Sequence, residues 1–230
     1  MTTKPRIALV HATTIAMEPI KHAFDQAWPD AETVNILEDS LSPDRARQDD
    51  LSNNLKDRIV ALTRYADLIG SDAVLFTCSA FGRAIEHAAT TVNIPVLKPN
   101  EAMFEAAIQK GGRIAMLYTF PPAQMGMEAE FREEAMRLNP SAKIVSFFVP
   151  DAIEAIRAGD VETHNRLVAE RAARLDDFDA ITLAHFSTAR ALKSVQAVTD
   201  VPVLTSPDAA VAKLHRLLIG TDQERVRGIV

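Results

Sequence analysis

The chain has 230 residues, of which 47% are hydrophobic, so it can bury a full core without help from disulfides or metals. Its net charge of −6 and its pI near 5.5 argue against a nucleic-acid binder and an anionic-membrane binder, because both need clustered Lys and Arg. A single cysteine, Cys78, excludes an internal disulfide, a zinc site built from several thiolates and a Cys-x-x-Cys redox motif.

The N-terminal segment "MTTKPRIALVHATT" carries too short an apolar run for a signal peptide. No stretch approaches about 18 uninterrupted apolar residues, the lower end for a membrane span. We therefore expect a soluble, cytoplasmic protein in a reducing compartment.

Short apolar runs with strand character recur along the chain, at residues 6–10, 33–37, 73–77, 95–98, 113–118, 143–149, 180–184 and 202–205. Longer segments between them, such as 49–68 and 161–175, have apolar residues at helical spacing. Residues 42–44 and 207–209 resemble helix N-terminal caps, and residues 110–112 resemble a helix end. Strands that are apolar on both faces and alternate with helices predict an α/β fold with parallel sheets covered on both sides.

A near-repeat relates the two halves of the chain at one fixed offset of 107 residues. Four blocks match: "DAVLFTCSAF" from Asp72 with "DAITLAHFST" from Asp179, "RIALVHAT" from Arg6 with "RIAMLYTF" from Arg113, "IPVL" from Ile94 with "VPVL" from Val201, and Arg83-Ala84 with Arg190-Ala191. A period this long indicates a duplicated lobe, unlike the short repeats of solenoid arrays. We predict two pseudosymmetric lobes, with residues 1–98 and 206–230 in the first and 99–205 in the second.

The repeat places Cys78 and His185 at equivalent positions, each directly after an apolar strand. Ligands of open parallel sheets sit beyond the carboxyl ends of the strands, so we expect an active site in the cleft between the lobes, with both side chains facing it. A nearby helix N-terminus favours the thiolate and is expected to lower the pKa of Cys78, and His185 has the capacity to exchange protons near neutrality. The structural alternatives are a buried inert thiol and a hydrogen-bonded core histidine.

The loops after equivalent strands are rich in hydroxyls and backbone N–H groups, which are suited to holding a carboxylate. Thr13, Thr14 and Ser187 also fit an alternative role as helix caps. The predicted substrate-binding residues are His11, Thr13, Thr14, Ser79, Ala80, Tyr118, Thr119, Phe120, Phe186 and Ser187. The sequence has no Walker loop, GxGxxG, GxSxG or HExxH motif, so we expect neither a cofactor nor a metal site.

Taken together, "DAVLFTCSAFG", "DAITLAHFSTARA", the two "PVL" strands and "HATTIAME" resemble the aspartate/glutamate/hydantoin racemase superfamily, whose relatives include arylmalonate decarboxylase and maleate isomerase. The resemblance implies two pseudosymmetric lobes and proton transfer by cysteines without a cofactor. Typical racemases of the group have a cysteine at both strand ends, whereas arylmalonate decarboxylase keeps one. Here Cys78 matches the first cysteine and His185 stands at the second.

The sequence therefore predicts a cofactor-independent racemase or isomerase of a small carboxylate or amino-acid-like substrate. Cys78 would be the base, acid or nucleophile, and His185 the opposing proton carrier. A single-cysteine decarboxylase and a cis-trans isomerase of a small dicarboxylate stay open as alternatives, as does a non-catalytic protein that binds a small acid. We expect a homo-oligomer.

Overall fold

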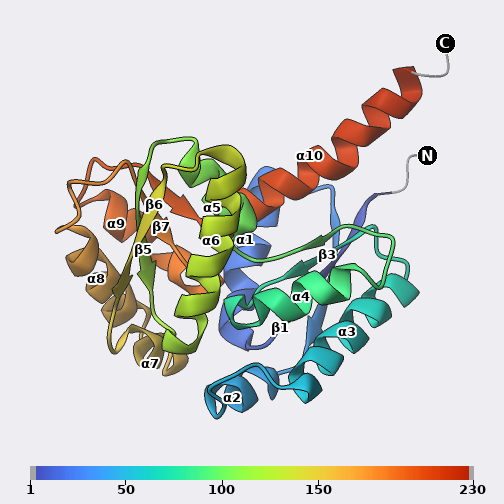
Figure 1. The fold of residues 1–230 in the computed structure, drawn as a ribbon, viewed down its shortest axis with the longest axis horizontal. Helices are drawn as coiled ribbons and strands as arrows, with labels where there is room; N and C mark the ends of the chain where they lie inside the picture. Colours follow the sequence, from blue (N-terminus) through green and yellow to red (C-terminus); the bar gives the residue numbers. More distant parts are fainter. Residues whose placement is uncertain (1–3, 228–230) are drawn as a thin grey trace.

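Two four-stranded parallel sheets form the framework of the protein in the computed structural model, which describes residues 4–227 (Figure 1). The first sheet has the order β2-β1-β3-β4, with β1 Arg6–His11, β2 Glu32–Leu37, β3 Ala73–Phe76 and β4 Val96–Leu97. The second has the order β6-β5-β7-β8, with β5 Arg113–Tyr118, β6 Lys143–Phe148, β7 Ala180–Leu183 and β8 Val203–Thr205. The predicted α/β fold with two parallel-sheet lobes is confirmed.

Helices cover both faces of each sheet, because alternate strand residues point to opposite sides. The α-helices are α1 Met17–Ala27, α2 Leu41–Ala46, α3 Asn53–Leu68, α4 Gly82–Ala89, α5 Glu101–Ile108, α6 Gln124–Leu138, α7 Ala152–Arg157, α8 Val161–Ala172, α9 Leu192–Gln196 and α10 Ser206–Arg227. Short 3-10 helices are η1 Thr14–Ala16, η2 Ser79–Phe81, η3 Pro121–Ala123 and η4 Phe186–Ala191. The expected caps at 42–44 and 207–209 instead lie inside the first turns of α2 and α10.

The pairing of strands repeats the offset seen in the sequence. Ile7 pairs with Ala73 in the first sheet, and Ile114 pairs with Ala180 in the second. The aspartate that opens each matching block has the same structural role in both lobes. Asp72 Oδ2 accepts a hydrogen bond of 2.7 Å from the first backbone N–H of β1, and Asp179 Oδ2 accepts one of 2.8 Å from that of β5.

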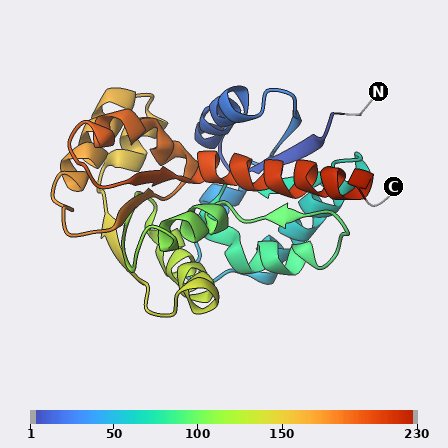
Figure 2. The same cartoon turned by 90° about the horizontal axis from the view of Figure 1, so that it is seen from above.

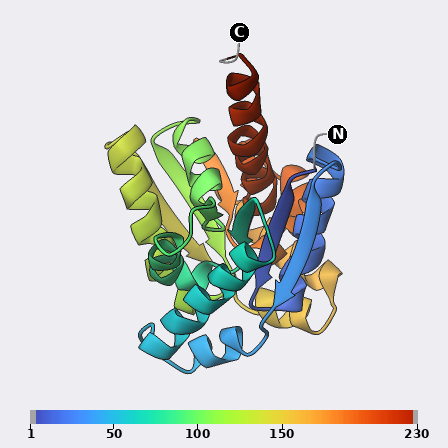
Figure 3. The same cartoon turned by 90° about the vertical axis from the view of Figure 1, so that its right-hand side faces the viewer.

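The helix that follows the last strand of each sheet crosses to the other lobe. α5 follows β4 but packs on the second sheet through Met103 and Phe104, and α10 follows β8 but packs on α1 and β1 (Figure 2). At the crossing, Ser206 Oγ donates to Asn100 Oδ1 at 2.6 Å, and both residues are fully buried. The C-terminal half of α10 extends beyond the two sheets (Figure 3). Within the described residues, no helix is both long enough and apolar enough to span a bilayer.

The loop before β5 offers a matched test of the aspartate contact. A Cβ added to Gly111 would lie 2.3 Å from the Asp179 carboxyl carbon, whereas a Cβ on Gly112 would meet nothing within 4 Å. Gly111→Ala should displace the Asp179 side chain from the Arg113 N–H and lower the free energy of unfolding by about 1 kcal/mol. Gly112→Ala should leave stability unchanged or slightly raised. Urea unfolding of both variants checks this, and equal midpoints would contradict it.

Candidate active site

The carboxyl ends of β3 and β7 meet at the junction of the two lobes. Cys78 follows β3 in extended conformation and leads into η2, whereas His185 follows β7 and leads into η4. Ser79 Oγ lies 2.8 Å from His185 Nδ1, which is a direct contact between the lobes. The backbone N–H of Phe120, in the loop after β5, donates to His185 Nε2 at 3.3 Å. Three of the predicted loops therefore converge.

His185 is 9% exposed and sits in the left-handed region of backbone space, with φ 74° and ψ 136°. Such a conformation is rare for any residue other than glycine and concentrates at functional sites. Burial lowers the pKa of the imidazole to about 4. The ring is therefore neutral at neutral pH, and it is a weaker base than an exposed histidine.

Cys78 is half-buried, and its surroundings favour the thiol over the thiolate. Burial raises the pKa of Cys78 to about 11, against the opposing effects of a hydrogen bond from the Ala80 backbone and the positive charges of Arg45 and Arg157. This corrects the expectation that a helix N-terminus lowers the pKa. The three-residue η2 stands between Cys78 and α4, and the loss of solvation outweighs the nearby dipoles and charges.

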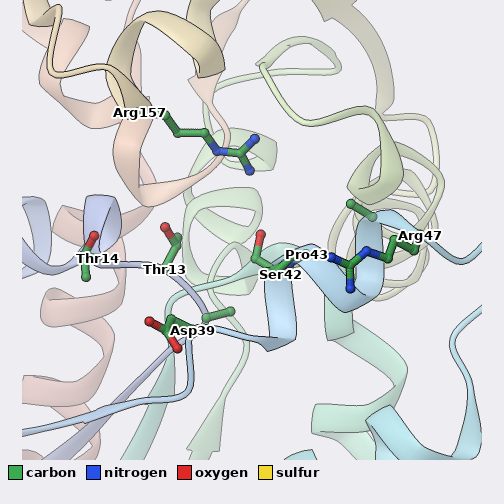
Figure 4. A pocket seen from close by; sticks show the side chains of 9 residues that line it. Thr13, Thr14, Asp39, Ser42, Pro43, Arg47 and Arg157 are labelled. Carbon is green, nitrogen blue, oxygen red and sulfur yellow. The ribbon is translucent and has the colours of Figure 1, made fainter.

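A pocket of about 510 Å³ lies beside this junction (Figure 4). Its lining comes from the segment that joins β1 to η1, from α2 and the residues on either side of it, and from the end of α7. It consists of Ala12, Thr13, Thr14, Asp39, Ser42, Pro43, Ala46, Arg47 and Arg157. The Thr13 and Ser42 hydroxyls lie on the side that faces the Arg157 guanidinium. Neither Cys78 nor His185 lines the pocket, and the link to the thiol is Arg157, whose charge acts on Cys78.

Arg45 is a functional candidate that sequence reasoning missed. Its side chain is buried at 8% exposure and donates only to backbone carbonyls: Ala80 at 3.4 Å, Gln48 at 2.5 Å and Pro122 at 3.3 Å. No carboxylate in the described part of the chain forms an ion pair with Arg45 or Arg157. A cation with so little compensation beside the thiol favours an anion in its vicinity. No local motif distinguished these arginines from surface ones.

The structure places His11 and Tyr118 at the ends of β1 and β5, and neither side chain lines the pocket. His11 is fully buried, with Nδ1 2.9 Å from Thr77 Oγ1 and Nε2 2.9 Å from Asn35 Oδ1, and burial lowers its pKa. The Tyr118 hydroxyl donates to Gln124 Oε1 at 2.5 Å. These bonds connect neighbouring strands and helices of one lobe.

The remaining predicted residues divide between the junction and the core. Phe186 is fully buried in the core cluster formed by α1, β1 and α10, so it packs between elements. Ser187 is buried, and Ala80 and Phe120 are half-buried. Thr119 is fully buried, and its hydroxyl oxygen has no hydrogen-bond partner among the described residues. No grouping of three or more His, Cys, Asp or Glu suited to a metal ion occurs in residues 4–220.

The thiol gives a direct test of this electrostatic environment, because Cys78 is the only cysteine in the sequence. With its pKa raised to about 11, the thiolate fraction at pH 8 is small, and the rate of alkylation by iodoacetamide should keep rising as the pH passes 10. A cysteine-containing peptide, which titrates near about 8.5, serves as the control. If the alkylation rate of the protein reaches its half-maximum at a pH equal to or below that of the peptide, the pKa of Cys78 is not raised.

No protein-family model and no curated protein sequence matches the chain. Solved structures do: a glutamate racemase from Bacillus anthracis (15% identity, TM-score 0.77, 94% of this chain and 82% of that one) and an allantoin racemase from Klebsiella pneumoniae (19%, 0.72, 94% and 88%). The Gly74Cys mutant of arylmalonate decarboxylase also matches (16%, TM-score 0.65, 93% of each chain). The chain thus has the two-lobe fold that the aspartate/glutamate/hydantoin racemase superfamily shares with arylmalonate decarboxylase.

Proposed function

We propose that the protein is an enzyme of the racemase and decarboxylase type, which transfers a proton at a carbon next to the carboxylate of a small acid. Cys78 is the proton-transferring side chain, and no cofactor takes part. The supporting observation is the position of the thiol, at the carboxyl end of β3, where the lobes meet. Two arginines act on it there that have no carboxylate partner among the described residues. Likeness of fold to both racemases and a decarboxylase agrees with this class but does not choose between the reactions.

The pocket provides the means to hold the substrate's carboxylate. Arg157 supplies the charge, and the Thr13 and Ser42 hydroxyls supply hydrogen bonds from the other lobe. Because residues of both lobes are needed, a bound acid would also hold the lobes in fixed relation. The charge of Arg157 acts on Cys78 as well, so substrate and thiol share one electrostatic environment.

The resting state of Cys78 favours its action as an acid. With a pKa raised to about 11, the side chain carries its proton at neutral pH and is ready to deliver it to a carbanion or enolate. Racemisation also needs a partner that removes a proton from the opposite face. His185 is the candidate for that role, but it is neutral and bonded at both ring nitrogens. This observation favours the second candidate function, decarboxylation or cis-trans isomerisation by one thiol.

Reaction in D₂O with a panel of amino acids, hydantoins and substituted malonates separates these functions. Racemisation places deuterium at the α-carbon and yields both enantiomers, whereas decarboxylation releases carbon dioxide and places one deuterium with one handedness. An unsaturated dicarboxylate in the same panel tests cis-trans isomerisation, which changes the geometry of the double bond and releases no carbon dioxide. Binding to the panel without turnover of any compound would instead identify a non-catalytic small-acid binding protein.

Cys78→Ala should lower kcat by about a hundredfold to ten-thousandfold, because a positioned acid or base contributes that much to proton transfer. The measurement is turnover of whichever panel compound the wild type converts. Circular dichroism and the melting temperature control for folding. Full activity in a folded Cys78→Ala variant would refute the proposed chemistry.

Arg157→Gln should raise KM for the acid by about tenfold to a hundredfold, the loss expected for a hydrogen bond to a charged group. Arg166→Gln is the matched control, because Arg166 is exposed and its ion pair among the described residues is with Glu170 on its own helix, at 2.8 Å. Steady-state kinetics or calorimetric titration of both variants checks this. An equal KM in the two variants would show that Arg157 does not bind the substrate.

A further inference from the structure

The imidazole of His185 is bonded on both sides by groups of different lobes. Nδ1 lies 2.8 Å from Ser79 Oγ of the first lobe, and Nε2 lies 3.3 Å from the Phe120 nitrogen of the second. Ser79 is 4% exposed and His185 is 9% exposed, so both contacts are shielded from water. A proton carrier needs a ring nitrogen that can face the substrate, and here each nitrogen already has a protein partner.

The partner of Nε2 determines where the imidazole carries its hydrogen. A backbone N–H can only donate, so Nε2 must accept the hydrogen bond from Phe120 through its lone pair. The hydrogen of the neutral ring is then on Nδ1, which donates it to Ser79 Oγ. Protonation of the ring would break the bond to Phe120, which agrees with a pKa lowered by burial.

This tautomer determines the role of the Ser79 hydroxyl. Its oxygen accepts the Nδ1 hydrogen bond, and its own hydrogen has no other acceptor within the described part of the chain. A hydroxyl that accepts one hydrogen bond becomes a stronger donor of another. Ser79 directly follows Cys78, so the same loop after β3 carries the thiol and this donor, which would stabilise charge that develops during proton transfer.

We propose that His185 is a positioning residue, whose neutral imidazole fixes Ser79 as a hydrogen-bond donor to the substrate and neither gains nor loses a proton in the reaction. The inference rests on the proposed function, in which Cys78 transfers the proton and His185 positions the Ser79 hydroxyl. Cys78 then exchanges the proton alone, on one face of the substrate. His185 has a positive φ of 74°, whereas its counterpart Cys78 has an extended backbone, so the two equivalent positions also differ in conformation.

Two substitutions at position 185 separate positioning from proton transfer. In His185→Asn, the side-chain amide nitrogen takes the place of Nδ1 and still donates to Ser79, and asparagine tolerates a positive φ better than most residues. In His185→Gln, the amide oxygen takes the place of Nε2, so the bond from Phe120 survives and the bond to Ser79 is lost.

We expect His185→Asn to stay within about tenfold of wild-type kcat, whereas His185→Gln and Ser79→Ala each lose about a hundredfold or more, with KM changed far less. The double variant Ser79→Ala/His185→Gln should match Ser79→Ala alone, since His185 acts only through Ser79. Equal loss in the Asn and Gln variants, or losses that multiply in the double variant, would show that His185 carries a proton and overturn the inference.

An NMR measurement tests the same inference without turnover. The ¹⁵N shifts of the His185 ring, assigned by their absence in His185→Asn, should show a protonated Nδ1 and a bare Nε2 at pH 7. Ser79→Ala should shift the Nδ1 signal, while His22→Asn, at an exposed helical position, should not. An Nε2–H tautomer or an imidazolium at pH 7 overturns the positioning role. If the expected tautomer is found but the protein converts no substrate, the tautomer assignment stands and the proposed function is wrong.

Discussion

The contact of 2.8 Å between Ser79 Oγ and His185 Nδ1 is the constraint on which the candidate site depends. It exists because two sheets of identical strand order present the carboxyl ends of equivalent strands to one another. The crossed helices α5 and α10 hold the lobes in this relation, and their buried Ser206–Asn100 hydrogen bond lies at the crossing. Without that arrangement, the thiol and the imidazole would belong to two unrelated strand ends.

Burial at the junction gives the site its electrostatic character. Loss of solvation raises the pKa of Cys78 and lowers the pKa of His185, so both side chains rest uncharged at neutral pH. The positive charges of Arg45 and Arg157 act on Cys78, and neither arginine has a carboxylate partner in the described residues. The site is therefore cationic before any ligand arrives, which favours the entry of a small anion.

The two lobes share a backbone pattern but differ in the residues that carry chemistry. Each lobe sends an arginine to an equivalent carbonyl of the other: Arg190 reaches the Ile15 oxygen at 2.6 Å, and Arg45 reaches the Pro122 oxygen at 3.3 Å. Arg190 is compensated by Glu18 at 3.1 Å, whereas Arg45 has no carboxylate partner in the part of the chain that the structure describes. The two arginines are not themselves equivalent, because the counterpart of Arg190 in the repeat is Arg83. The charge without a carboxylate partner among the described residues lies on the side of the thiol.

The sequence by itself determined the two-lobe α/β fold and the equivalence of Cys78 and His185. Both follow from the order of residues along the chain, through hydrophobic periodicity and a repeat at one fixed offset, without knowledge of tertiary contacts. Only the tertiary structure decided that His11 is held within a sheet, that Phe186 belongs to the core, and that Arg157 faces the pocket. It also reversed the expected shift of the thiol pKa. Solvation and hydrogen bonding depend on groups that are distant in sequence, so no local pattern specifies them.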